Sequence, residues 1–130
     1  MLYNIIGGDN SMYEVIYYSD NDDNPILNFL LKLSDKEQAK ILREIDLLEK
    51  FGFALGMPHI KKMTGTDSLW ELRIKHSSNN FRIFYFHFID NKFVLLHAIR
   101  KTTQKTPTKD INLALKRKDN YIKGCDNNES

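Results

Sequence analysis

Apolar residues follow a helical period in the first half of the chain. Between residues 25 and 51 they recur every three or four positions, which is the spacing of amphipathic helices. Asn24-Pro25 combines an N-cap residue with proline at the first helical position, so we expect a short helix that runs through Leu33. Ser34-Asp-Lys-Glu37 is a capping-box pattern and predicts a second helix, which ends at Phe51-Gly52. The two helices form a hairpin that must bury its apolar side, most simply against a sheet.

The second helix has one apolar stripe and an opposite polar side. We expect the stripe to contain Ile41, Leu42, Ile45 and Leu48, with Leu47 beside them. The polar side is expected to contain Lys40, Arg43, Glu44 and Lys50.

Alternating and β-branched segments predict strands in the rest of the chain. Between Leu69 and Lys75 the alternation is strict, so Trp70, Leu72 and Ile74 face one way while Glu71, Arg73 and Lys75 face the other. The remaining predicted strands are Met12–Tyr18, the short His59–Met63, and the long Phe81–Ile89 and Phe93–Arg100, which Asp90-Asn91 joins as a hairpin. Thr64–Ser68 and Ser77–Asn80 are expected to be turns.

A final helix is expected after Thr106-Pro107, with Ile111, Ala114, Leu115 and Ile122 on one face. The order β-α-α-β-β-β-β-α predicts an α+β fold, in which a mainly antiparallel sheet packs against an N-terminal helical hairpin. We expect residues 1–11 to be a flexible leader, residues 12–122 a single domain, and residues 123–130 a disordered tail.

The composition of the chain is that of a globular protein and argues against several other classes of protein. Apolar residues make up 42% and charged residues 28% of the 130 positions, which is typical of an ordinary globular domain. No apolar run approaches the ~20 residues of a membrane-spanning helix, so no membrane partner is expected. No Lys or Arg precedes Lys32, which argues against a secretory signal, and the single cysteine, Cys125, excludes a disulfide framework. A cytoplasmic location is therefore expected.

The sequence gives little support for a metal or a cofactor. The four histidines, His59, His76, His87 and His97, have no metal-binding spacing between them. No glycine-rich loop follows a strand and opens a helix, so nucleotide cofactors have no support either.

Charge is distributed unevenly over the chain. Residues 1–56 hold five basic and ten acidic residues, whereas residues 57–123 hold fourteen basic and five acidic ones. A basic half on a protein with a net charge of +2 suggests a polyanion partner, because Lys and Arg gain by displacing counterions from phosphates. The alternative is that these residues simply keep the surface hydrated.

Five cations belong to neighbouring predicted strands or follow them. These residues are Arg73, Arg82, Arg100, Lys101 and Lys105. If the strands are adjacent, the cations can form one patch that binds RNA phosphate and stabilises the charge that develops when a 2′-hydroxyl attacks it.

Two further side chains are candidates for contact with RNA. Tyr85 could stack on a base, and His97 could transfer protons because histidine titrates near neutrality. His97 is expected on the same face as Phe93, Leu95 and Ile99, so a half-buried structural role is the alternative. Trp70 is expected in the core rather than under a base.

Three motifs together resemble the toxins of the RelE/ParE superfamily, above all the HigB-like, phage-derived branch. They are Leu69-Trp-Glu-Leu-Arg73, Phe81-Arg-Ile-Phe-Tyr85, and Leu96-His97 followed by Lys101-Thr-Thr-Gln-Lys-Thr-Pro107. The resemblance spans residues 12–122, and its specificity comes from the order and spacing of the motifs.

The resemblance implies a RelE-like fold and the toxin of a type II toxin–antitoxin system. HigB-like toxins cleave mRNA on the ribosome by metal-independent attack of the 2′-hydroxyl. A small helix-turn-helix (HigA-like) antitoxin neutralises them, and only the complex of the two binds operator DNA.

The matching motifs indicate which residues of this chain occupy the site positions of the family. Arg73, Arg82, Lys101 and Lys105 match catalytic positions, and Tyr85 and His97 are added as weaker candidates. We expect Lys61, Lys62, Lys75 and Arg100 to bind RNA or the ribosome. Thr102 and Ile99 stand where this branch often has a lysine and an aromatic residue. Two alternatives remain, namely a ParE-like inhibitor of DNA gyrase and an inactive module that binds only RNA or an antitoxin.

Overall fold

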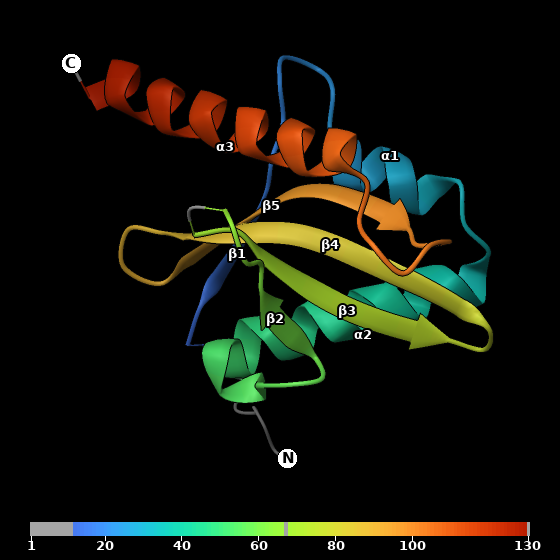
Figure 1. The fold of residues 1–130 in the computed structure, drawn as a ribbon. Coiled ribbons are helices and arrows are strands. Elements are labelled where there is room, and N and C mark those ends of the chain that lie inside the picture. Colours follow the sequence, from blue (N-terminus) through green and yellow to red (C-terminus); the bar gives the residue numbers. More distant parts are fainter. Residues whose placement is uncertain (1–11, 67, 130) are drawn as a thin grey trace.

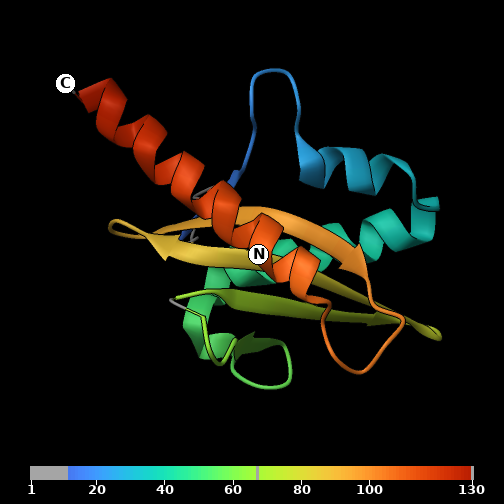
Figure 2. The same ribbon diagram turned by 45° about the horizontal axis from the view of Figure 1, so that its top comes forward.

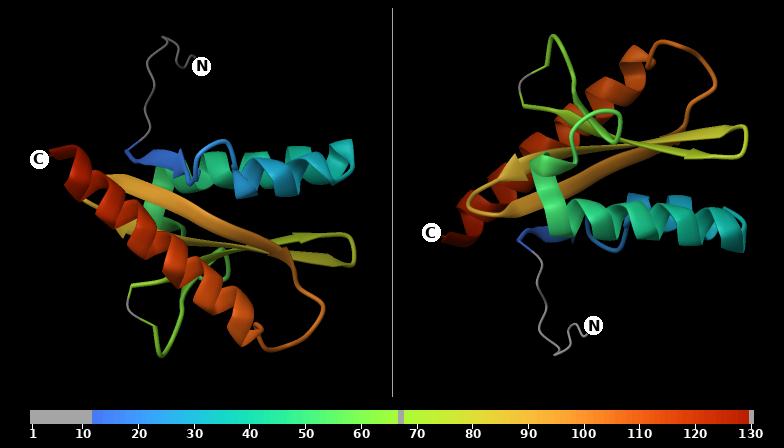
Figure 3. Two further views of the ribbon diagram at one scale, coloured as in Figure 1. Left: turned by 90° about the horizontal axis from the view of Figure 1, so that it is seen from above. Right: turned by 90° about the horizontal axis from the view of Figure 1, so that it is seen from below.

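The protein has a five-stranded sheet with helices on both faces. The computed structural model describes residues 12–66 and 68–129. Helices α1 and α2 cover one face of the sheet and α3 crosses the other (Figures 1 and 3). In chain order the elements are β1 (Glu14–Tyr17), α1 (Pro25–Leu31), α2 (Asp35–Phe51), the 3-10 helix η1 (Gly52–Leu55), β2 (Ile60–Lys62), β3 (Trp70–His76), β4 (Asn79–Phe88), β5 (Lys92–Arg100) and α3 (Thr108–Glu129).

The sheet has the strand order β1-β5-β4-β3-β2. From β2 to β5, each strand pairs antiparallel with the next strand along the chain, whereas β1 pairs parallel with β5, so the sheet is mixed. The predicted α+β class and the predicted order of elements are confirmed. The turn between β3 and β4 is tighter than expected, because Asn79 and Asn80 already belong to β4.

The predicted helix starts are also confirmed. Ser34 Oγ accepts a hydrogen bond from the Glu37 N–H at 3.2 Å, and Glu37 Oε1 accepts one from the Ser34 N–H at 3.1 Å. The Asn24 side chain accepts from the Leu27 N–H at 3.2 Å, ahead of proline at the first position of α1. These side chains satisfy backbone donors that have no partner inside the helix.

Two residues of α2 lie on the opposite side from the one expected. Leu42 is 42% exposed, whereas Glu44 is only 7% exposed. Ile41, Ile45 and Leu48 define the buried stripe, and Glu44 lies three residues after Ile41 and four before Leu48. Helical geometry therefore places Glu44 on the stripe and turns Leu42 away from it.

Each face of the sheet has its own apolar core. Ile26, Leu30, Ile41 and Leu48 of the helical hairpin pack against Leu72, Ile74, Phe81 and Tyr85. On the other face, Ala114 of α3 packs with Leu69, Phe84, Phe86, Val94 and Leu96, and Ile111, Leu115 and Ile122 lie around it as predicted. Figure 2 shows how α3 crosses this face.

Helix α3 is longer than expected. It continues to Glu129 through most of the segment that we expected to be disordered. No proline interrupts the segment, and the single Gly124 costs a helix only about 1 kcal/mol. The expected leader, residues 1–11, lies outside the described residues. Within the described ranges, no helix is both long and apolar enough to cross a membrane.

Candidate functional site

Two arginines lie side by side on neighbouring strands and on the same face of the sheet. Arg73 of β3 is the register partner of Arg82 of β4. Arg82 alternates with Phe84 and Phe86, so it belongs to the face that α3 covers further along the strand. The Arg73 side chain is 29% exposed and the Arg82 side chain 9% exposed. Arg82 Nη1 donates to the carbonyl of Phe81 at 3.0 Å, which helps to hold its guanidinium.

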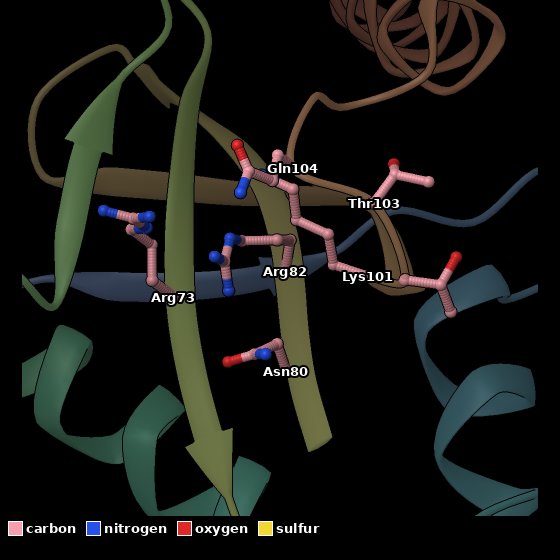
Figure 4. Close-up of a pocket in the computed structure, with 7 residues that line it drawn as sticks. Arg73, Asn80, Arg82, Lys101, Thr103 and Gln104 are labelled. Atoms are coloured by element: carbon pink, nitrogen blue, oxygen red, sulfur yellow. The ribbon is translucent and has the colours of Figure 1, made fainter. Parts of the chain in front are cut away.

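Lys101 joins the arginine pair from the segment that follows β5. Its backbone N–H donates to the carbonyl of Asn80 at 2.7 Å, so its position is tied to β4. The side chains of Arg73, Arg82 and Lys101 line one hollow of about 470 Å³ (Figure 4). We call this the arginine hollow, and its lining residues are Arg73, Asn80, Arg82, Lys101, Thr102, Thr103 and Gln104.

A buried carboxylate lies beside the two arginines. Glu71 Oε1 is 3.5 Å from Arg73 Nε and 3.8 Å from Arg82 Nε, and the Glu71 side chain is 6% exposed. We did not single out Glu71 from the sequence. The signal was its spacing, because residues two apart on a strand share a face and Glu71 therefore lies next to Arg73.

Burial and like charge shift the titration of the cations. Desolvation, followed by repulsion from Arg73, lowers the pKa of Arg82 below its ordinary value. Desolvation and then the charge of Arg82 lower the pKa of Lys101 from 10.5, whereas Glu71 opposes this shift. An ammonium with a lowered pKa is a better proton donor, and the arginines keep their charge at any physiological pH.

Two smaller hollows adjoin the arginine hollow. The loop hollow, about 250 Å³, has Lys61, Glu71, Lys101, Gln104 and Lys105 in its lining. The edge hollow, about 370 Å³, is lined by Lys40, Pro58, His59, Arg73, Ile74, Lys75, Asn80 and Arg82. The structure thus brings Lys75 next to the arginine pair, and Lys61 and Lys105 into one hollow with Lys101. Lys62 is exposed on the other side of β2 and lines none of the three hollows.

Arg100 lies on the opposite face of the sheet from Arg82. Its register partner is Phe81, its guanidinium lies 5.0 Å from the centre of the Phe81 ring, and Nη2 is 3.4 Å from Glu37 Oε2. Consecutive strand residues face opposite ways, which separates Arg100 from Lys101. Arg100 therefore fastens α2 to the sheet, which differs from the RNA contact that we expected.

Tyr85 lies in the core beneath the helical hairpin. Its side chain is fully buried, and burial raises the pKa of its hydroxyl. Residues 82 and 85 are an odd number of positions apart, so Tyr85 faces away from the arginine hollow. The expected stacking of Tyr85 on RNA is wrong for this conformation.

His97 lies under α3 rather than in the arginine hollow. Its Nε2 is 2.8 Å from Asp110 Oδ1, and its Nδ1 accepts from Arg117 Nη1 at 3.1 Å. Desolvation, aided by Arg117, lowers its pKa below 6.5 despite the hydrogen bond to Asp110. The contacts favour the structural role that the sequence left as an alternative.

A bulge explains why the expected face of His97 is wrong. Phe84 pairs with His97 but Tyr85 pairs with Leu95, so Leu96 is an extra residue in β5. An extra residue reverses the alternation beyond it. His97 consequently faces α3, whereas Phe93 and Leu95 face the helical hairpin.

The described residues include no group of three or more histidine, cysteine, aspartate or glutamate side chains arranged to hold a metal ion. The arginine hollow instead offers positive charge and hydrogen-bond donors, which suit a phosphate group.

Comparison with known proteins assigns the chain to a family. No curated protein matches the chain. Residues 28–119 match a family model described as phage derived protein Gp49-like (DUF891), which covers more than half of the chain and includes Arg73, Arg82 and Lys101. The chain therefore belongs to the Gp49-like family of phage-derived proteins.

Proposed function

We propose that this protein is the toxin of a type II toxin–antitoxin pair and that it cleaves mRNA on the ribosome. The observation that carries the proposal is the arginine hollow, where Arg73, Arg82 and Lys101 converge and no acidic residue of the described part of the chain is in the lining, although Glu71 lies beside both arginines. Membership of a phage-derived family and the resemblance to HigB-like toxins, with the RelE-like fold that it implies, support the same function.

The reaction is transesterification within the RNA strand. The 2′-oxygen attacks the adjacent phosphorus, the bond from phosphorus to the 5′-oxygen breaks, and a 2′,3′-cyclic phosphate and a 5′-hydroxyl form. Arg73 and Arg82 neutralise the nonbridging oxygens, where negative charge develops. Lys101 gives a proton to the leaving 5′-oxygen, for which its lowered pKa suits it.

Neighbouring lysines extend the binding surface. Lys61 and Lys105 share the loop hollow with Lys101, and Lys75 lies in the edge hollow. These cations contact phosphates on either side of the scissile bond or those of ribosomal RNA. A helix-turn-helix antitoxin is the partner that completes the proposal, and operator DNA is bound only through that complex.

The test is cleavage of a defined mRNA by the purified chain, with and without programmed ribosomes, followed by mapping of the RNA ends. We expect cuts in register with codons, only in the presence of ribosomes, and cyclic phosphate at the new 3′ ends. Intact RNA from folded protein would contradict the proposal. Altered DNA supercoiling in a gyrase assay would then favour the ParE-like alternative.

The first variant is Arg73→Ala, matched with Arg43→Ala on the exposed side of α2. Loss of one preorganised charge at the phosphate costs about 10²–10³ in rate. Arg73 is partly exposed, so thermal unfolding should change little. Equal losses of rate in the two variants would contradict a specific role for the arginine hollow.

A further inference from the structure

The proposed reaction needs a group that takes the proton from the 2′-hydroxyl, and Arg73, Arg82 and Lys101 are unsuited to it. The guanidiniums stay protonated, and Lys101 serves the leaving oxygen on its side of the pair. Among the described residues, the edge hollow has one histidine in its lining, His59, and imidazole is the side chain that most often serves as a general base.

His59 is held in place from both sides of its backbone. Its N–H donates to the carbonyl of Gly56 at 3.0 Å, and its carbonyl accepts from the Arg73 N–H at 2.8 Å. The second bond fixes His59 directly beside one of the two arginines. The His59 side chain is 45% exposed, so the ring remains open to a substrate.

The carboxylate of Glu44 lies next to the imidazole ring of His59. Its Oε1 lies 3.6 Å from His59 Nδ1, and its Oε2 lies 3.5 Å from Lys40 Nζ. A carboxylate with only 9% of its side chain exposed is rare on a helix unless it has partners. A carboxylate at Nδ1 favours the tautomer with the proton on that nitrogen, which leaves Nε2 as the acceptor.

The strand order places the two proton-transfer groups on opposite sides of the arginines. His59 precedes β2, Arg73 and Arg82 lie on β3 and β4, and Lys101 follows β5. Arg73, Asn80 and Arg82 line both the edge hollow and the arginine hollow, so a phosphate between the arginines has His59 on one side and Lys101 on the other. Displacement at phosphorus requires the attacking and leaving oxygens to be nearly in line, so a base and an acid on opposite sides of the arginines suit this reaction.

We propose that His59, oriented by Glu44, is the general base of the RNA cleavage, an assignment that rests on the proposed function. The 2′-hydroxyl gives its proton to His59 Nε2 as the bond between the 2′-oxygen and phosphorus forms. The bond to the 5′-oxygen breaks, and Lys101 Nζ supplies the proton that this oxygen needs. Protons and electrons balance without another reactant. Glu44 is a positioning residue, because it acts only through the imidazole.

The test compares the pH dependence of single-turnover cleavage on programmed ribosomes for the wild-type chain, His59→Gln and Glu44→Gln. The charged groups that face His59 are Glu44 and Lys40 from α2, Arg73 and Lys75 from β3, and Arg82 from β4. We expect a wild-type rate that rises with pH over the range where an imidazole loses its proton. His59→Gln should cut the rate by about 10²–10⁴ and remove this rise.

Two further variants separate chemistry from structure. Glu44→Gln should keep the rise but shift its midpoint, with a smaller loss of rate than His59→Gln. In His59→Ala, added imidazole should restore part of the rate, which a structural defect would not allow. His87→Gln is the matched control, because His87 lies near the β4–β5 turn and lines none of the three hollows.

The outcomes distinguish the two proposals. If the wild-type chain cleaves RNA and His59→Gln cleaves with the same rate and pH dependence, the assignment of His59 is wrong while the nuclease function stands. Loss of rate without rescue by imidazole and with an unchanged pH profile also overturns it. If the wild-type chain leaves RNA intact on programmed ribosomes, both proposals fail together.

Discussion

Arg73 and Arg82 lie side by side although their charges repel each other. The carboxylate of Glu71, within 4 Å of both Nε atoms, offsets that repulsion. Arg82 Nε is buried and has no hydrogen-bond partner among the described residues, so Glu71 is its nearest compensating charge. The arginine pair thus depends on an anion within the protein.

Glu71→Gln should lower the free energy of unfolding by about 1–3 kcal/mol, because it leaves the buried guanidinium of Arg82 without a counter-charge. Urea unfolding at pH 7 measures the change. Asp119→Asn, an exposed carboxylate on α3, is the control and should have no effect. An unchanged unfolding midpoint in Glu71→Gln would show that the arginines do not need this anion.

Tyr85→Phe should stabilise the protein. The Tyr85 hydroxyl is buried and has no hydrogen-bond partner in the described part of the chain, and burying an unpaired hydroxyl costs about 1–3 kcal/mol. Removing it should raise the free energy of unfolding by about 1 kcal/mol and leave RNA cleavage unchanged. Tyr18→Phe is the comparison, because the Tyr18 hydroxyl accepts from Asn120 at 3.4 Å. Loss of cleavage in Tyr85→Phe would show that the Tyr85 hydroxyl has a role in the reaction after all.

At the scale of elements, His97 links β5 to α3 in its neutral form. Its Nε2 is 2.8 Å from Asp110, and Arg117 donates to Nδ1 and to the carbonyl of Leu96. A proton on Nδ1 would remove the acceptor that Arg117 uses. Docking of α3 on the sheet is therefore sensitive to acid.

Stability should fall as the pH drops below about 6.5 toward the lowered pKa of His97. In that range the unfolded chain binds a proton at His97 and the folded chain does not, so stability increases with pH across the range and is constant with respect to this residue above it. His97→Gln should reduce this slope in urea unfolding between pH 5 and 7. His76→Gln, at the end of β3, should keep the wild-type slope. Equal slopes in all three proteins would exclude His97 as the cause.

Local patterns predicted the elements because each one carries its own signals. Ser34 with Glu37, proline at position 25, and the alternation after Leu69 act through neighbours in the chain. The bulge at Leu96 depends on how β5 pairs with β4, so sequence alternation alone assigned His97 to the wrong face.

Part of the candidate site could be predicted from the strand pattern in the same way. Arg73 and Arg82 could be paired from adjacent strands, and Lys101 follows the next strand. His59 and Glu44 are far apart in the sequence, and Glu44 was assigned to the polar side of its helix. Their meeting depends on how α2 packs beside β2, which no local pattern encodes.

At the scale of the whole molecule, charge follows the architecture. The first 56 residues, which include α1 and α2, are acidic overall, whereas β2 to α3 are basic. The arginine hollow lies in the basic part. Binding of RNA should therefore depend on salt through a small number of cations.

Affinity for a short 2′-O-methyl RNA, which lacks the attacking hydroxyl, should fall with salt at a slope near −2 in a double logarithmic plot. This slope follows from about 0.7 per phosphate contact at three cations, Arg73, Arg82 and Lys101. Lys101→Ala should make the slope shallower by about 0.7. Fluorescence anisotropy measures both, with Lys50→Ala on the exposed side of α2 as the control. If Lys101→Ala leaves the slope unchanged, RNA binds somewhere other than the arginine hollow.

The cations of the site come from two kinds of structure. Arg73 and Arg82 belong to paired inner strands, whereas Lys101 and Lys105 belong to the connection between β5 and α3. Such connections tolerate substitution and insertion better than inner strands do. Under the proposed function, substitutions at residues 102–107 can change which RNA is bound, while Arg73, Arg82 and Lys101 keep the chemistry. Under that function, selection for a new RNA target can act on this segment without changing the groups that perform the chemistry.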